Sequence, residues 1–328
     1  MARYACCTPG GQADLVQVWR CLGTIHAHAA LTPGMASNMD ETMNDTDKAA
    51  LGSPPTEASA PGAPQPARKE EKQENFFVFL IKLVVLVVVF RSFIFSPFNI
   101  PSESMLPRLL NGDYLLASKW SYGFSKYSMP FSLPLIPGRI FASQPDRGDI
   151  VIFKAPPGND TDYIKRVIGL PGDTVQVRNG QVFLNGKGIP KQRIDNFLLP
   201  LTPNTHCYAV EFETQLPDGS LACSYPQFKE TLPEGKSYNV LDLGTQPQDD
   251  TIAFKVPADH MFLMGDNRDN SLDSRFPAIE GAGIGLVPQA NLVGKAAVMM
   301  FSTNGGAEWL KPWTWFTAAR FSRIGGTF

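Results

Sequence analysis

The pattern of apolar and polar residues along this chain is dominated by one long apolar run at residues 76–95. The run reads FFVFLIKLVVLVVVFRSFIF, and 17 of its 20 positions are apolar. A helix of this length, at about 1.5 Å rise per residue, is long enough to cross the hydrocarbon core of a bilayer. Lys82 and Arg91 interrupt the run, but both lie near enough to an end for their side chains to extend toward the headgroups. We therefore predict one transmembrane helix over residues 76–95.

Two other interpretations of this run fit less well. A buried core strand or helix is the main alternative, because Val and Phe dominate the run. A cleaved secretory signal is a poor match, because the run begins 75 residues into the sequence and is not followed by a cleavage site of small residues.

The segments beyond the apolar run show the pattern of short strands separated by turns. Residues 149–154 (DIVIFK) and 162–170 (DYIKRVIGL) are predicted strands, and LPGD at 170–173 has Pro-Gly where a type II turn needs it. Residues 174–187 alternate around two Asn-Gly pairs, which is a strong hairpin signal. The fold class is therefore predicted as mainly β, an antiparallel β-sheet domain over 96–328 preceded by one transmembrane helix.

Residues 190–258 form a long, turn-rich stretch that we predict to be a smaller inserted β subdomain. Cys207 and Cys223 lie within it, and in an oxidising compartment they could form a disulfide. Two unrelated buried thiols are the alternative.

The segment before the apolar run, residues 1–75, is predicted to be disordered. Its composition is rich in Pro, Ala, Ser and charge, which cannot bury enough apolar surface to offset the entropy of ordering. Met35, Met39 and Met43 lie inside it, so translation starting at one of them is an additional hypothesis. An intact mass that begins at Met1 would end that hypothesis.

The charges that flank the apolar run predict its orientation. Arg68, Lys69 and Lys72 precede it, whereas only Arg108 follows within 15 residues. Because positive charge is retained on the cytoplasmic side, the N-terminus is predicted to be cytoplasmic and residues 96–328 extracytoplasmic.

Composition narrows the class of protein further. A formal net charge of −2 provides no basic field for phosphates, so we expect no nucleic-acid partner. None of the five cysteines forms a C-x-x-C pair, and we expect no metal and no cofactor. Near the end of the chain Trp309, Trp313, Trp315 and Phe316 mix with basic residues, which fits a bilayer interface or an ordinary core edge.

Three segments concentrate polar groups in unusual settings, namely 101–105, 163–169 and 265–275. In the second, strand alternation places Lys165 and Arg166 on opposite faces, so one of the two cations must face apolar neighbours. A lysine desolvated in this way has a lowered pKa and can act as a general base. The plainer interpretation is a strand lysine whose ammonium lies in water.

A base needs a nucleophile, and serine reacts only when a neighbour takes its proton. Only His206 and His260 lie beyond the apolar run, and no G-x-S-x-G motif accompanies any serine, so a histidine triad is poorly supported. A calcium loop beginning at Asp269 is a further alternative, but Ser274 occupies the position that requires glycine.

These segments, in this order after a membrane anchor, resemble the type I signal peptidases, the membrane-bound Ser-Lys endopeptidases that remove signal peptides from exported proteins. The resemblance covers about residues 76–328 and rests on PSESMLP, GDYLL, RGDIVIF, DYIKRVIGLPGD and GDNRDNSLDSR. It implies that Ser104 is the nucleophile and Lys165 the general base. Ser102 would complete the oxyanion hole with the Ser104 backbone N–H.

The resemblance implies supporting roles for a further set of residues. Ser271 would orient the lysine ammonium, and Asp273 with Arg275 would brace its loop. An extended preprotein segment would pair with strand edges near 97–102 and 162–164. Small pockets would then accept the A-x-A residues before the cut. The substrate-binding residues expected on this basis are Phe98, Ile100, Pro101, Tyr163 and Ile164.

The expected partners are signal-peptide-bearing preproteins and the lipid bilayer. The expected location is the bacterial inner membrane, with one span and a periplasmic catalytic domain. Arg108 departs from the family pattern, which commonly has threonine there. The alternatives are a self-cleaving repressor-type Ser-Lys protease and a non-catalytic membrane-anchored β module that binds extended peptides.

Overall fold

The structure is a computed structural model that describes residues 75–129, 132, 134, 136–308 and 310–328. The described residues all belong to one compact unit. The predicted disordered segment 1–75, with its alternative start sites and its basic residues, lies outside the described residues except for Asn75. Trp309 also lies outside them.

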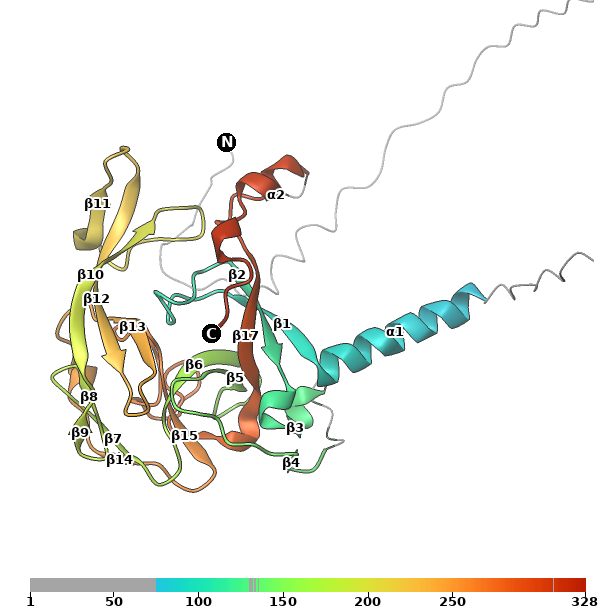
Figure 1. Ribbon diagram of the computed structural model, residues 1–328, viewed down its shortest axis with the longest axis horizontal. Coiled ribbons are helices and arrows are strands. Elements are labelled where there is room, and N and C mark those ends of the chain that lie inside the picture. Colours follow the sequence, from blue (N-terminus) through green and yellow to red (C-terminus); the bar gives the residue numbers. More distant parts are fainter. Residues whose placement is uncertain (1–74, 130–131, 133, 135, 309) are drawn as a thin grey trace, which may run out of the picture. The chain divides into compact units, whose positions relative to one another are not determined.

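The predicted membrane helix is α1, Phe76–Phe93 (Figure 1). The Asn75 side chain caps it by accepting a hydrogen bond from the Phe77 N–H at 3.2 Å. Its 18 residues have a mean hydropathy of 2.5, and only 6% of them are buried. By length and composition α1 can therefore cross a membrane. It ends two residues before the expected boundary, because Phe95 already pairs with Ser118 in a sheet.

The main sheet contains seven antiparallel strands in the order β1-β2-β17-β5-β6-β15-β16. Figure 1 shows α1 running directly into its first strand. The strands of this sheet are β1 (Phe95–Ile100), β2 (Asp113–Ser118), β5 (Ile150–Lys154), β6 (Asp162–Gly169), β15 (His260–Met264), β16 (Val287–Pro288) and β17 (Leu292–Ser302). The mainly β, antiparallel fold predicted from alternation is confirmed.

A second sheet follows from the two Asn-Gly hairpins. Asn179 and Gly180 both have positive φ, at 47° and 69°, as the tight turn between its first two strands requires. Its strands, in the order β14-β7-β8-β9, are β7 (Thr174–Arg178), β8 (Gln181–Leu184), β9 (Lys187–Gly188) and β14 (Phe254–Lys255). The short pair β3 (Phe124–Ser125) and β4 (Arg139–Ile140) forms a separate ribbon.

The expected insertion contains a third sheet, in which β12 pairs with three neighbours. The strands are β10 (Lys191–Pro200), β11 (Glu213–Gln215), β12 (Leu221–Thr231) and β13 (Ser237–Leu241). Cys207 and Cys223 are joined by a disulfide, with their Cα atoms 5.4 Å apart. The end of the predicted range belongs elsewhere, because β14 pairs with β7.

The C-terminal segment carries one short helix, α2 (Trp313–Thr317). Trp313, Trp315 and Phe316 present much of their side-chain surface to solvent. This exposure fits the predicted bilayer interface, which stays a prediction.

Candidate active site

Ser104 lies on the turn that follows β1. The 265–275 loop is hydrogen-bonded to the backbone of this turn. The Asn267 backbone N–H donates to the Ser104 carbonyl at 3.1 Å, and the Asn267 side chain donates to the Glu103 carbonyl at 3.2 Å. Met105, the next residue, and Leu109 are fully buried in a core cluster that also contains residues of β1 and β2. The hydroxyl of Ser104 is therefore carried by a rigid segment of the chain.

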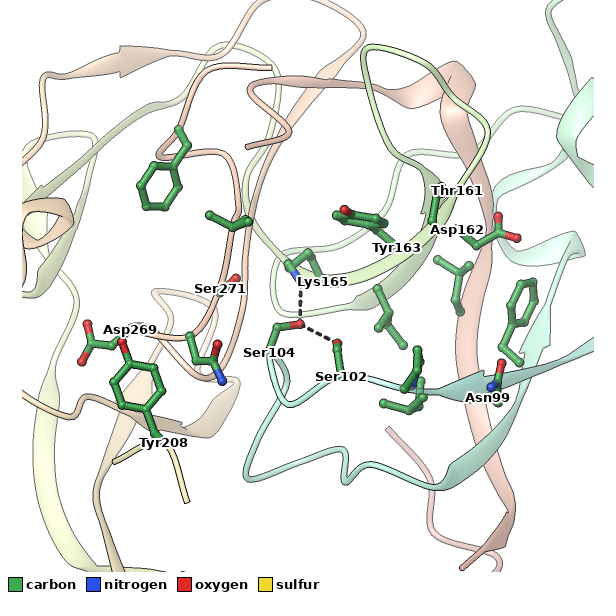
Figure 2. A pocket seen from close by; sticks show the side chains of 18 residues that line it. Asn99, Ser102, Ser104, Thr161, Asp162, Tyr163, Lys165, Tyr208, Asp269 and Ser271 are labelled. Atoms are coloured by element: carbon green, nitrogen blue, oxygen red, sulfur yellow. Dashed lines mark hydrogen bonds between the residues drawn. The ribbon is translucent and has the colours of Figure 1, made fainter. Parts of the chain in front are cut away.

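Lys165 reaches the same point from β6. Its Nζ lies 2.6 Å from Ser104 Oγ (Figure 2). Burial lowers the pKa of Lys165 to about 8, against the opposing attraction of Asp273 and Asp266. Among the described residues no carboxylate forms an ion pair with this ammonium. Its neutral form can therefore be populated near neutral pH, and the same contact then lets the Ser104 hydroxyl donate to Nζ.

Ser102 lies beside this pair, with its Oγ 3.3 Å from Ser104 Oγ. Two residues earlier on the same turn, it is exposed toward the pocket that lies along β1. The structure thus brings together the three polar groups that the sequence singled out, Ser102, Ser104 and Lys165.

The 265–275 loop closes the site from the other side. Asp273 and Arg275 form a buried bidentate pair with distances of 2.8 and 2.9 Å, and Asp273 also accepts from the Gly265 N–H at 3.1 Å. Burial alone would raise the pKa of Asp273, but the Arg275 guanidinium holds that pKa below its usual value. The loop therefore holds a fixed ion pair whose first residue, Asp273, lies two positions after Ser271 in the sequence.

Gly265 allows this loop to pass close to the nucleophile turn. A Cβ at this position would collide with Ser271 Oγ and with the Ser104 carbonyl oxygen. Only glycine fits that approach.

Ser271 lies near Lys165 and Ser104 (Figure 2). Its Oγ is buried and, within the described part of the chain, has no hydrogen-bond partner. The expected hydrogen bond from the lysine to Ser271 is therefore not formed in this conformation, although the hydroxyl remains available to it.

Two further ion pairs fix the loop, and the sequence analysis missed both. Arg166, next to Lys165 on β6, pairs with Asp266 at 2.7 and 2.6 Å. Arg268 pairs with Glu230 of β12 at 2.8 and 2.6 Å, which ties the inserted sheet to the loop. Alternation on β6 correctly placed Arg166 opposite Lys165, but no local signal identifies partners 100 and 38 residues away.

A pocket of about 540 Å³ opens in front of Ser104. All five residues expected to bind substrate line it, namely Phe98, Ile100, Pro101, Tyr163 and Ile164. Its other apolar lining, which the sequence analysis did not name, includes Ile152, Tyr208, Leu272 and Phe276. The pocket is predominantly apolar, as ligand-binding pockets generally are.

Both strands that border this pocket have unpaired edges. Among the described residues, β1 is the end strand of the main sheet and pairs only with β2. In the described part of the chain, β6 pairs with β15 only from Arg166 onward, so its residues 162–165 have β5 on one side alone. Backbone N–H and C=O groups on both sides of the pocket are thus available to an extended peptide.

The histidines and the calcium-loop interpretation considered from the sequence do not explain this site. Neither His206 nor His260 lines the pocket around Ser104. The alternative calcium loop is not supported, because the Asp273 carboxylate is fully engaged by Arg275.

One carboxylate cluster among the described residues could hold a cation. Asp242, Asp249 and Asp269 place oxygens within 4.8 Å of one another, but the Lys191 ammonium already pairs with Asp242 there. No step below uses this cluster.

Comparison with known proteins finds one matching family and several relatives. The sequence profile of the family described as signal peptidase, peptidase S26, matches residues 73–301. Signal peptidase I of Rickettsia typhi is 34% identical over 278 residues, which cover 78% of this chain and 93% of that protein. Signal peptidase I of Rickettsia prowazekii is 35% identical over 281 residues, covering 79% and 94%. A crystal structure of a signal peptidase I from Enterococcus faecalis V583 aligns with 47% of this chain and 97% of its own, with 26% identity and a TM-score of 0.24.

The β fold thus combines a groove between unpaired strand edges with a buried serine-lysine pair, an arrangement with the parts needed to bind and cleave a peptide. The profile match and the relatives establish the family: the chain belongs to the signal peptidase family, peptidase S26, and is a serine peptidase of that family. The resemblance stated from the motifs is confirmed.

Proposed function

We propose that this chain is a membrane-anchored endopeptidase that removes signal peptides from preproteins through a Ser104-Lys165 dyad. The observation that carries the proposal is the 2.6 Å contact between Lys165 Nζ and Ser104 Oγ in a buried setting. Serine is inert until its proton is taken, and a lysine with a pKa lowered to about 8 is a base that can take it.

The proposed reaction has two halves. Ser104 Oγ attacks the carbonyl carbon of the scissile bond while its proton passes to Lys165 Nζ. The resulting oxyanion accepts hydrogen bonds from the Ser104 backbone N–H and the Ser102 hydroxyl. Lys165 then protonates the leaving amine, the peptide C–N bond breaks, and an acyl-enzyme remains. Water, deprotonated by Lys165, releases the signal peptide and restores Ser104.

Supporting roles are proposed for the loop. Ser271 would accept a hydrogen bond from the Lys165 ammonium during the step in which the lysine is protonated, and Asp273 with Arg275 would hold Ser271 in reach. The fully satisfied Asp273–Arg275 pair supports this role, because a rigid loop holds Ser271 in the lining of the pocket that Lys165 also lines.

Substrate recognition would use the unpaired strand edges on the two sides of the pocket. An extended preprotein segment would add to the edges of β1 and of β6 residues 162–164 by backbone hydrogen bonds. Phe98, Ile100, Pro101, Tyr163 and Ile164 would admit small side chains before the cut and exclude large ones, which gives the A-x-A preference.

Membrane anchoring by α1 would bring enzyme and substrate to one surface. The N-terminus would be cytoplasmic and the catalytic domain extracytoplasmic, in agreement with the basic residues before α1. A preprotein is held at the same surface by its own apolar signal segment, so the encounter takes place at a raised effective concentration.

The test is preprotein cleavage by the full chain in detergent, followed by sequencing of the new N-terminus. We expect one new N-terminus after an A-x-A site, and loss of cleavage in Ser104→Ala and in Lys165→Ala. A preprotein with Phe at the residue before the cut is the matched substrate control and should resist cleavage. If both variants still cleave, the dyad assignment fails. If the proteins bind the preprotein without cutting it, the chain is a binding module.

A further inference from the structure

A second cavity, of about 190 Å³, lies at the end of α1 where the helix enters the β domain. Its charged lining comes from four separate elements. Arg91 belongs to the last turn of α1, Lys119 follows β2, Lys154 ends β5, and Asp162 begins β6. The fold therefore collects three cations and one carboxylate in a space that the proposed reaction does not use.

The positive charge in this cavity is only partly compensated. Lys154 Nζ pairs with Asp162 at 3.1 Å. Lys119 is buried, and its Nζ donates to the Ser128 carbonyl at 2.6 Å. In the described part of the chain, no carboxylate forms an ion pair with Arg91 or Lys119. Burial, and next the charge of Arg91, lower the pKa of Lys119 to about 8 against the attraction of Asp162. The lining of the cavity therefore carries more positive than negative charge.

The position of this cavity along α1 corresponds to headgroup depth. The 18 residues of α1 span about 27 Å, close to the thickness of a bilayer core. Arg91 lies in the last turn. Phe95, two residues after the end of α1, packs edge-on against half-exposed Trp120, with ring centroids 4.7 Å apart. Tryptophan at such a junction is typical of the membrane-water interface.

We propose that this cavity binds the phosphate of an anionic phospholipid headgroup, with Arg91, Lys119 and Lys154 around its oxygens. The inference rests on the membrane anchoring proposed above. A phosphate diester carries one negative charge, which would offset part of the positive excess of Arg91, Lys119 and Lys154 over Asp162, and its oxygens accept hydrogen bonds from guanidinium and ammonium groups. The volume is below the roughly 300–1,000 Å³ of pockets for whole drug-sized ligands, so it suits a headgroup whose acyl chains stay in the bilayer.

A phosphate bound in this cavity would also affect the pocket in front of Ser104. Phe98 and Asp162 line both this cavity and the pocket in front of Ser104. A phosphate held by Lys154 would compete with Asp162 for that ammonium. Because the cavity lies between the end of α1 and the sheet, the bound lipid would also hold the two substrate-binding strand edges at a constant depth relative to the headgroups.

The experiment places the full chain in bilayer discs of phosphatidylcholine and phosphatidylglycerol in equal amounts. After transfer to detergent, the lipid that remains bound is identified by mass spectrometry. Wild type should retain phosphatidylglycerol preferentially. Arg91→Gln should reduce this preference about fivefold, as removal of one cation near an anionic surface does, and Arg91→Lys should keep most of it.

Lys126→Gln is the matched control. Lys126 is exposed on the short 3-10 helix Lys126–Ser128, beside the cavity but not in its lining. Its substitution removes the same charge and should leave the preference unchanged. Equal losses in Arg91→Gln and Lys126→Gln would reduce the effect to general surface attraction and overturn the inference.

Two further arms separate the source of the phosphate and the proposed function. Millimolar inorganic phosphate should not displace the bound lipid, and displacement would identify a soluble-anion site instead. Preprotein cleavage is measured in the same discs. If wild type cleaves normally but shows no phosphatidylglycerol preference, the lipid inference fails while the proposed function stands. If wild type cleaves in no disc, the proposed function fails.

Discussion

Lys165 and Arg166 are neighbours on β6, and the chain treats the two buried cations in opposite ways. Lys165 is 4% exposed and Arg166 is 5% exposed. Arg166 pairs through two hydrogen bonds with the buried Asp266 carboxylate and stacks 4.2 Å from the Tyr238 ring. Lys165 contacts the Ser104 hydroxyl, which carries no charge.

The difference shows how equal burial leads to different chemistry. Burial opposes both charges, but the Asp266 carboxylate raises the pKa of Arg166 and keeps it cationic, whereas burial of Lys165 lowers its pKa to about 8. One face of β6 thus holds a permanent structural charge. The other holds an amine that can exchange a proton.

The largest effect should come from Lys165→Met, which removes the amine and keeps an apolar side chain of similar length. We expect kcat/KM for preprotein cleavage to fall roughly 10³-fold, within the range that a general base contributes. Thermal stability should stay the same or rise, because a poorly solvated cation is lost. Lys187→Met, at an exposed position on β9, is the control and should cleave normally. Activity within tenfold of wild type would contradict the role of Lys165.

The second largest effect should come from the face of β6 that carries Arg166. Arg166→Met leaves the Asp266 carboxylate buried without its partner, and this should lower the free energy of unfolding by about 3–5 kcal/mol. Urea denaturation measures the change. The double variant Arg166→Met with Asp266→Leu should recover much of it, because no unpaired charge remains. A loss in the double variant as large as in the single one would show that the pair does more than compensate charge.

A third effect is the pH dependence that distinguishes the two cations. Since neutral Lys165 is the active form, kcat/KM should rise with pH through about 8 and then level off. The folded protein holds Lys165 neutral between about pH 8 and 10.5, where the unfolded chain still binds its proton. Stability of wild type relative to Lys165→Met should therefore rise by roughly 3 kcal/mol across that window. A cleavage rate that is flat from pH 6 to 9 would contradict the lowered pKa.

The smallest effect should come from Ser271→Ala. If Ser271 orients the protonated lysine, kcat should fall about tenfold with KM unchanged, the loss expected for one hydrogen bond to a charged group. The pH at which the cleavage rate rises should shift with it, because this rise follows the pKa of Lys165. Stability should not fall, because the buried Ser271 Oγ has no partner among the described residues. Ser274→Ala is the control: its Oγ accepts from the Leu263 N–H at 3.0 Å, so stability rather than kcat should change.

Much of the fold could be predicted because its signals are local. The two Asn-Gly turns define hairpins over residues 174–187, and the apolar run before β1 defines α1 to within two residues. The motifs around Ser104 and Lys165 pointed to the pair that the fold brings to 2.6 Å. The partners of Arg166 and Arg268 were not predicted, because ion pairs between distant segments leave no periodic pattern.

The basic cavity at the end of α1 illustrates the same limit. Arg91, Lys119 and Lys154 appear in the sequence as unrelated cations, 28 and 35 residues apart. Only the pairing of β2, β17, β5 and β6 brings them to one place.

By itself the sequence determined that Lys165 and Arg166 point to opposite faces of a strand, because side chains alternate along extended backbone. It also determined the apolar helix and the serine turn that follows it. The tertiary structure alone decided which of the two cations would meet a carboxylate and which a hydroxyl. The reason is physical: burial and ion pairing depend on what packs within a few ångströms, and the loop that supplies Asp266 lies about 100 residues away along the chain.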